Sequence, residues 1–335
     1  MTYSYRAYGL KLTSNTPICA LRHRLGDFGA PDVAMIFGPE PGWVRDAKRM
    51  PICVERLRSA EPREGDRPFA LTSFGQGEFF LIAYCDGTRF MVDKTASRLW
   101  GACPSPLTEE DLATYLLGPV LGFVLRQRGI TALHSSSVCL NGKAVIFCGA
   151  SGSGKSTTAA ALALRGVPLL TEDISPLRES CGALHVEPGY PRVCLWPESV
   201  AALLGSQEAL PRLTPSWEKR YLGLQREFET AKREVGVVYI LAPRVSHAGA
   251  PRIEQLGARE ALLGLVQNTY MNWLLDRDQR GAELHILAKL VESVPVCKLV
   301  PHRDPARIGA LCDLIAGDAR RQIGDHSFAA AGYGR

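Results

Sequence analysis

Residues 149–156 read Gly149-Ala150-Ser151-Gly152-Ser153-Gly154-Lys155-Ser156 and match the phosphate-loop pattern G-x-x-x-x-G-K-[ST] in full. An apolar run at 143–148 precedes this glycine loop and is rich in residues that favour strands. Residues 157–165 follow it, are rich in alanine and leucine, and end at Gly166. Strand, glycine loop and helix in this order are the context that a phosphate-binding loop requires.

The glycine loop predicts a site for a nucleoside triphosphate, with ATP and Mg²⁺ as the expected cofactors. Glycines let backbone N–H groups face phosphate oxygens, and the N-terminus of the following helix adds partial positive charge. Lys155 is expected to reach the β- and γ-phosphates, and the Ser156 hydroxyl to ligate Mg²⁺. The alternative, a glycine-rich turn with a chance Lys-Ser pair, is disfavoured by both flanks. The expected nucleotide-binding residues are Gly149, Ala150, Ser151, Gly152, Ser153, Gly154, Lys155, Ser156 and Thr157.

The composition is that of a folded chain of about two domains. Of the 335 residues, 46% are hydrophobic and 22% are charged, which is enough to bury a substantial core. The formal net charge of +5 is small and the basic residues are scattered, so we expect no nucleic-acid partner. The chain has no run of 18 apolar residues and no apolar stretch at its start, which predicts a cytoplasmic protein without a membrane partner.

The ten cysteines favour free thiols over a metal site or disulfides. They form no C-x-x-C pair and have no histidine pair at zinc spacing. Several, such as Cys139 and Cys148, lie in apolar runs, where cysteine acts as a small hydrophobic residue.

Turn and linker signals divide the chain into two modules of an α/β protein. Asp86-Gly87 and Asn141-Gly142 each lie between strand-like runs and predict hairpins. Residues 103–106 contain two prolines and resemble a linker. We therefore expect a small β-rich N-terminal domain at 1–107, a P-loop catalytic domain at 108–317, and a flexible tail at 318–335. In the second module we expect a helix at 108–128 that Gly118-Pro119 can interrupt, and further helices at 260–276, 281–294 and 304–316. We expect strands at 192–196, 235–241 and 296–300.

A histidine and an acidic pair lie at fixed distances from the loop lysine. His134 comes 21 residues before Lys155, on the strand expected at 131–140. Glu172 and Asp173 come 17 and 18 residues after Lys155, at the end of an apolar strand at 167–171. Acids at such a strand end hold Mg²⁺ and act on the nucleophile in P-loop proteins. The alternatives are an exposed strand end for the acids and a hydrogen-bonded core histidine for His134.

This arrangement resembles the catalytic domain of the HPr kinase/phosphorylase family, which implies a P-loop kinase fold. The matching features are His134, the glycine loop, Arg165-Gly166 at the helix end and Glu172-Asp173, and the likeness is weaker over 176–315. The chain is similar to stand-alone members from peptide-modification pathways, including kinases that phosphorylate the C-terminal serine of lasso-peptide precursors. That similarity rests on Gly189-Tyr190-Pro191-Arg192, Leu195-Trp196-Pro197, Glu218-Lys219-Arg220-Tyr221-Leu222 and Asn268-Thr269-Tyr270.

The resemblance implies a role for each matching residue. Asp173 would be the general base that takes the proton from an acceptor hydroxyl. His134 would steer that carboxylate or stabilise charge beside the γ-phosphate. Arg192 could neutralise the charge of the transferred phosphate, with a surface arginine as the alternative. The expected catalytic residues are therefore Asp173, His134, Lys155 and Arg192, and the expected metal ligands are Ser156, Glu172 and Asp173.

Lys219, Arg220 and Glu172 each have more than one interpretation. Lys219 and Arg220 lie in a charged segment and could clamp a phosphate or the acceptor, although solvated side chains are the simpler interpretation. Glu172 stands where the family has aspartate and is one methylene longer, so its contact with Mg²⁺ would be direct or through water.

These features predict an ATP- and Mg²⁺-dependent kinase for a serine hydroxyl of a peptide or small protein, with a lasso-peptide-type precursor as the first candidate. The alternatives are a kinase for a small-molecule hydroxyl and a nucleotide-binding regulator without phosphoryl transfer. The N-terminal module does not match that of the regulatory HPr kinases, which argues against HPr as the acceptor. No convincing copy of the family's phosphorolysis motif is present, so we predict no phosphorylase activity. The oligomers formed by full HPr kinases raise homo-oligomerisation as an expectation.

Overall fold

The chain forms two compact units in a computed structural model that describes residues 1–21, 29–57, 69–215 and 217–324. Unit 1 consists of Met1–Gly129 and Thr214–Trp217, and unit 2 of Ile130–Leu213 and Glu218–Arg335. The division after Gly129 differs from the boundary expected at 107/108. The helices that follow residue 108 group with unit 1, and Tyr115 from the first of them stacks on Tyr84 with ring centroids 3.9 Å apart.

Unit 1 is built on a sheet whose strand order is β1-β2-β3-β8-β7-β6-β5-β4. Trp100, Met91 and Phe74 pack with Val44 in its core. The hairpin expected at Asp86-Gly87 joins β6 to β7, and only the glycine of this pair has positive φ, at 90°. The strands are β1 (Tyr3–Ala7), β2 (Leu10–Ser14), β3 (Val33–Phe37), β4 (Ile52–Leu57), β5 (Phe69–Phe74), β6 (Phe79–Tyr84), β7 (Arg89–Asp93) and β8 (Arg98–Ala102).

The helices of unit 1 are α1 (Gly42–Ala47), α2 (Glu109–Tyr115) and α3 (Leu121–Gln127). Thr108 begins α2 with a capping box, in which its hydroxyl accepts from the Asp111 N–H and the Asp111 carboxylate accepts from the Thr108 N–H. The interruption expected at Gly118-Pro119 within the helix at 108–128 is a π-helical turn, Leu116–Val120, between α2 and α3. Proline has no N–H for the helical ladder, which explains the irregular turn.

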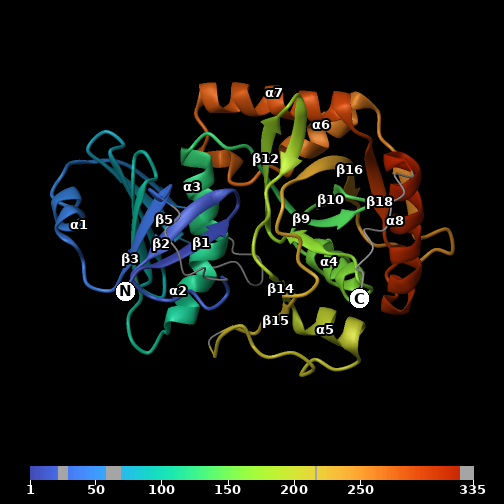
Figure 1. The fold of residues 1–335 in the computed structure, drawn as a ribbon, viewed down its shortest axis with the longest axis horizontal. Coiled ribbons are helices and arrows are strands. Elements are labelled where there is room, and N and C mark those ends of the chain that lie inside the picture. Colours follow the sequence, from blue (N-terminus) through green and yellow to red (C-terminus); the bar gives the residue numbers. More distant parts are fainter. Residues whose placement is uncertain (22–28, 58–68, 216, 325–335) are drawn as a thin grey trace, which may run out of the picture. The chain divides into compact units, whose positions relative to one another are not determined.

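Unit 2 is a three-layer α/β arrangement around β10, the strand that leads into the glycine loop (Figure 1). β10 pairs antiparallel with β9 and parallel with β16, which pairs parallel with β18. The other edge of β9 pairs with β11 and β12. The strands are β9 (Ala132–Leu140), β10 (Lys143–Cys148), β11 (Leu169–Thr171), β12 (Ile174–Ser180), β13 (Ala183–Val186), β14 (Arg192–Leu195), β15 (Arg220–Gly223), β16 (Arg233–Leu241), β17 (Arg252–Gln255) and β18 (Val296–Val300).

Alternate side chains of β10 face two separate cores. Val145 and Phe147 pack with α4 (Lys155–Ala163), α5 (Pro197–Leu204) and α8 (Ile308–Ile323). Ile146 and its neighbours at 144 and 148 pack with α6 (Ala258–Gln267) and α7 (Arg277–Ser293). A strand that is apolar on both faces belongs in the middle of such a sheet, where helices cover it from both sides. The glycine loop therefore leaves a strand whose last five residues are all buried.

Two helix ends differ from the sequence expectation. The helix expected at 260–276 ends at Gln267, after which the chain pairs with β9 and only Asn272–Leu274 form a 3-10 turn. The last helix continues to Ile323, so residues 318–323 are not part of a loose tail. Asp318 is 7% exposed and accepts a hydrogen bond of 2.8 Å from the Tyr239 hydroxyl, which explains why the helix continues. The rest of the expected tail, 325–335, lies outside the described residues.

The described part of the chain bears on the membrane and cysteine expectations. None of the helices there has both the length and the apolar character needed to cross a bilayer. The ten cysteines are all free, and Cys139, Cys148, Cys297 and Cys312 are buried.

Candidate active site

The glycine loop has the backbone that its glycines make possible. Gly149, Gly152 and Gly154 have φ values of 146°, 77° and 107°. A Cβ on Gly149 would lie 3.1 Å from the Leu241 carbonyl oxygen, so strand β16 leaves no room for a side chain there. Positive φ favours glycine at all three positions, and close packing adds a second reason at Gly149.

Lys155 folds back over the loop that precedes it. Its ammonium group donates to the carbonyl oxygens of Gly149, at 2.9 Å, and Ala150, at 3.2 Å. Lys155 is 6% exposed, and this burial lowers the pKa of its ammonium group although the carboxylates of Asp173 and Glu172 oppose the shift. Both carbonyl contacts are ones that phosphate oxygens could replace without leaving the lysine unpaired.

Ser156 and Glu172 form a direct pair beside the loop. The Ser156 hydroxyl donates to Oε1 of Glu172 at 2.9 Å. Glu172 is 6% exposed, and burial together with the adjacent Asp173 raises the pKa of its carboxyl to about 7. Lys219, Ser156 and Lys155 oppose this shift.

The donor set fits Mg²⁺ held jointly with a phosphate chain. The described residues include no group of three or more His, Cys, Asp and Glu side chains with metal-site geometry. Mg²⁺ is usually bound by one or two protein oxygens together with substrate phosphates, so an all-protein cage is not required. The hard oxygen ligands available here are the Ser156 hydroxyl and the carboxylates of Glu172 and Asp173.

Asp173 lies in a tight turn between β11 and β12, and both its backbone carbonyl and its carboxylate have hydrogen-bond partners. Its backbone is left-handed, with φ at 66°, and its carbonyl oxygen accepts from the Ser135 N–H at 3.2 Å. Its Oδ1 lies 3.3 Å from Nδ1 of His134, and its Oδ2 accepts from the Tyr270 hydroxyl at 3.3 Å. Aspartate is one of the non-glycine residues that adopt this backbone most often, so the turn suits Asp173.

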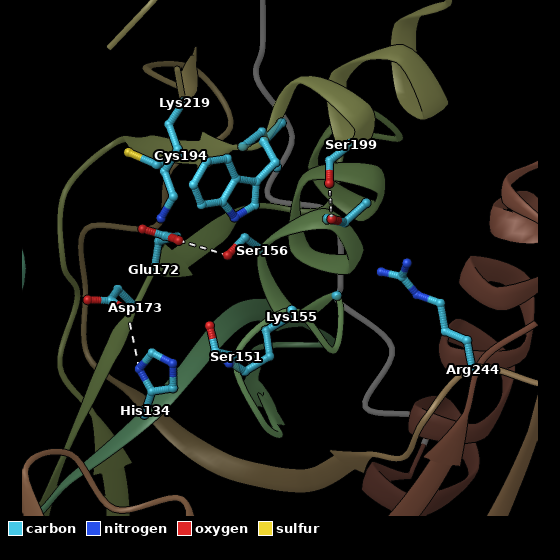
Figure 2. Close-up of a pocket in the computed structure, with 15 residues that line it drawn as sticks. His134, Ser151, Lys155, Ser156, Glu172, Asp173, Cys194, Ser199, Lys219 and Arg244 are labelled. Carbon is cyan, nitrogen blue, oxygen red and sulfur yellow. Dashed lines mark hydrogen bonds and ion pairs between the residues drawn. The ribbon is translucent and has the colours of Figure 1, made fainter. Parts of the chain in front are cut away.

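Sheet register explains why His134 and Asp173 meet. Ile174 on β12 is the direct neighbour of His134 on β9, so the preceding turn places Asp173 next to the imidazole (Figure 2). Burial alone would raise the pKa of the Asp173 carboxyl, but the hydrogen bond and charge of His134, together with Lys219 and Lys155, outweigh it and lower that pKa to about 2. The side chain is 30% exposed and therefore reachable from the pocket.

One pocket contains these groups and encloses about 640 Å³ of empty space, including its mouth. Of the residues expected from the sequence, His134, Ser151, Gly152, Gly154, Lys155, Ser156, Thr157, Glu172 and Asp173 line it. Gly149, Ala150 and Ser153 belong to the loop but are not part of that lining. Figure 2 shows the side chains converging from the glycine loop, β9, the turn after β11 and the segments around 194–199 and 219.

Arg192 lies elsewhere. Its guanidinium stacks on the ring of Tyr221 at 4.1 Å, across the β14–β15 pair, and it is not among the described residues that line the pocket. The cations of the pocket are instead Lys155, Lys219 and Arg244.

Several pocket residues were not expected from the sequence. Arg244 follows β16, the strand parallel to β10, and a guanidinium nitrogen lies 3.0 Å from where a Cβ of Gly154 would be. Lys219, for which solvent exposure was the simpler expectation, places its ammonium group 5.0 Å from the ring centroid of Trp196. The position after a parallel strand beside the loop strand is the signal that would have indicated Arg244. Cys194, Leu195, Trp196 and Ser199 complete the lining.

Comparisons with known proteins give distant likenesses among solved structures alone. No family model matches the chain, and no curated protein matches it. Among solved structures, it is similar to the HPr(Ser) kinase/phosphatase from Coxiella burnetii, with a TM-score of 0.31 and 14% sequence identity. The match covers 57% of this chain and 91% of the other. At this level of similarity, function has to be argued from the residues of the site.

Proposed function

We propose that this pocket binds ATP with Mg²⁺ and transfers the γ-phosphate to a serine hydroxyl of a peptide or small protein. One observation carries the proposal: the Asp173 carboxylate, paired with His134, lines the same pocket as Lys155 and Ser156 of the glycine loop. A kinase for hydroxyl groups needs a carboxylate beside the phosphate loop to receive the acceptor proton. A nucleotide-binding regulator would use such a carboxylate for Mg²⁺ alone, without the paired histidine and without a proton to accept.

Three cations are available for the phosphate chain. Lys155 is positioned to exchange its two loop carbonyl partners for β- and γ-phosphate oxygens. Arg244, beside Gly154, and Lys219, over Trp196, add positive charge on other sides of the pocket. Phosphoryl transfer depends mainly on positioning and charge neutralisation, so this distribution suits it.

Ser156, Glu172 and Asp173 would hold the Mg²⁺ ion. When bound, the metal supplies neutralisation of the phosphate charge. The Ser156 hydroxyl would turn from Glu172 Oε1 toward the metal, which leaves that carboxylate oxygen free to act as the second ligand.

The transfer step requires one proton acceptor on the protein. The oxygen of the acceptor hydroxyl forms a bond to the γ-phosphorus, and Asp173 accepts the proton that this hydroxyl loses. The bond from that phosphorus to the β–γ bridging oxygen breaks, and ADP leaves with the electron pair. His134 holds the carboxylate at Oδ1 throughout.

A peptide acceptor is favoured by the lining of the pocket. Two of the four segments that resemble the lasso-peptide precursor kinases supply Leu195, Trp196 and Lys219 to it. An indole and an aliphatic side chain beside an ammonium group form a wall that suits a peptide ending in serine and a carboxylate, so a lasso-type precursor is the first acceptor to test.

The test is mass spectrometry of serine-terminated precursor peptides, and of HPr, after incubation with the protein, Mg²⁺ and ATP. We expect a gain of one or more phosphates on a peptide, and none with Lys155→Ala. Asp173→Asn should lower the transfer rate by about 10²–10⁴-fold while nucleotide binding, measured by calorimetry, persists. Lys232→Ala, at an exposed position outside the pocket, is the matched control and should transfer phosphate at the normal rate.

The alternatives predict different results. Transfer only to a small-molecule hydroxyl would identify a metabolite kinase. ATP binding without transfer to any acceptor would indicate a nucleotide-binding regulator, in which Asp173→Asn leaves the output intact.

A further inference from the structure

A short segment after α6, Asn268–Tyr270, takes the place of a strand beside β9. β10 ends at Cys148, which pairs with Ser135, and beyond that point the edge of β9 is covered by this segment. The His134 N–H donates to the Asn268 carbonyl at 2.7 Å, and the Tyr270 N–H donates to the Ala132 carbonyl at 2.8 Å. We call Asn268–Tyr270 the strap. Its backbone is fixed to the same strand that carries His134.

One end of the strap holds the start of the glycine loop. The Asn268 amide oxygen accepts from the Gly149 N–H at 2.9 Å, and its amide nitrogen donates to the Gly264 carbonyl at 2.8 Å. Because the amide is satisfied on both sides, its orientation is determined by its partners. Gly149 is the first residue after β10, so this contact lies where the chain turns from strand to loop.

The other end holds the carboxylate expected to receive the proton. The Tyr270 hydroxyl donates to Oδ2 of Asp173 at 3.3 Å, while His134 contacts Oδ1. The Tyr270 ring lies 5.7 Å from the His134 ring, centroid to centroid, and Tyr270 is 7% exposed. A hydroxyl–carboxylate contact of this length is long, and such contacts in unliganded sites tighten when the substrate binds.

We infer that Tyr270 is a positioning residue for the phosphoryl transfer and acts through Asp173; this inference rests on the proposed function. With both carboxylate oxygens held, rotation of the Asp173 side chain is blocked, and its position relative to an acceptor hydroxyl is set before that acceptor binds. Tyr270 is not among the described residues that line the pocket. Its contribution therefore appears in the rate of transfer and not in ATP binding.

Tyr270→Phe tests this directly because it removes the hydroxyl and keeps the ring. We expect kcat for peptide phosphorylation to fall about 10-fold or more, as for loss of orientation at a proton acceptor, with KM and Kd for ATP within about twofold of their normal values. In an Asp173→Asn background the same change should cause no further loss, because the partner carboxylate is already gone.

Tyr239→Phe is the matched control. Its hydroxyl also donates to a buried aspartate, Asp318 at 2.8 Å, but on the face of β16 that packs with α8, away from the pocket. This variant should lose thermal stability and keep kcat, whereas Tyr270→Phe should lose kcat and keep most of its stability.

The possible results distinguish a failure of the Tyr270 role from a failure of the proposed kinase activity. Phosphorylation by the wild-type protein with a normal kcat in Tyr270→Phe would overturn the positioning role alone. A loss in Tyr270→Phe that persists in the Asp173→Asn background would also overturn it, because the hydroxyl would then act elsewhere. No transfer by the wild-type protein to any acceptor would overturn the proposed function and the role of Tyr270 with it.

Discussion

Gly149→Ala tests the close approach of the glycine loop to strand β16. A side chain here meets two obstacles: a backbone at φ 146°, and the Leu241 carbonyl oxygen 3.1 Å from the new Cβ. Ser153 Oγ would lie 2.7 Å away but can rotate, whereas a backbone carbonyl within a sheet cannot.

The expected loss follows from these two contributions. Positive φ costs an alanine about 1–2 kcal/mol, and overpacking against fixed atoms adds about 1–3 kcal/mol. The lower entropy of the unfolded alanine chain returns about 0.4–1 kcal/mol. The net loss in the free energy of unfolding is about 1–5 kcal/mol, which lowers Tm by about 2–20 °C for a unit of this size.

Two other glycines separate these contributions. Gly166, after α4, has φ at 86° and no atom within 4 Å of an added Cβ, so Gly166→Ala measures backbone strain alone. Gly281, inside α7, has no such neighbour and no positive φ, so Gly281→Ala should stabilise the protein by about 0.5–1 kcal/mol. Calorimetric unfolding of the three variants should rank them Gly281, Gly166, Gly149 from most to least stable. Equal losses for Gly149→Ala and Gly166→Ala would refute the steric contact with β16.

Three further predictions concern single side chains. Arg244→Ala should weaken ATP binding by about 10- to 100-fold and AMP binding much less, measured by titration calorimetry, because hydrogen bonds to charged groups contribute about 1.5–3 kcal/mol; equal effects on both nucleotides would contradict a phosphate contact. Ser175→Ala removes the 2.7 Å partner of the buried Ser137 hydroxyl and should lower the free energy of unfolding by about 1–3 kcal/mol in denaturant titrations. Burial alone would raise the pKa of the Asp93 carboxyl, but hydrogen bonds from Arg98 and Ser97 outweigh it and lower that pKa below its ordinary value of 3.8. The ionised carboxylate therefore stabilises the fold above pH 3.8, and this stabilisation is lost as the pH falls through the lower pKa that Asp93 has in the folded protein. Asp93→Asn should therefore flatten the acid limb of the stability curve, and an unchanged limb would show that Asp93 does not contribute to it.

The parts of the site that could be predicted are those determined by local sequence. The hairpin at Asn141-Gly142 forms with both residues at positive φ, 49° and 75°, and this turn sets the register of β9 against β10. That register places Ser135 opposite Cys148 as the last pair, so His134 on β9 comes level with Gly149, where the loop starts. The short strand at Leu169–Thr171 pairs with β9, and the turn after it places Asp173 beside His134.

The parts that could not be predicted depend on contacts between distant segments. Arg244 reaches the loop only because β16 pairs with β10, and no local pattern in the sequence specifies that pairing. The helix expected at 260–276 ends early because Asn268 finds partners on Gly149 and Gly264, while Met271 takes a left-handed backbone at φ 50°. The apolar pattern continues past that point, so periodicity alone overestimates the helix.

Thr214–Trp217 belong to unit 1 although the residues on both sides belong to unit 2, and this limits where the chain can be cut into fragments. The polypeptide passes from one unit to the other three times, after Gly129, Leu213 and Trp217. A fragment that begins at Ile130 would carry Trp217 without Tyr115, the unit 1 ring that it meets at 5.7 Å, and would expose an indole that is covered in the intact chain. Lys219 follows two residues later and lines the pocket. Truncation at the first crossing would therefore remove a ring partner of Trp217, two residues before a residue that lines the pocket.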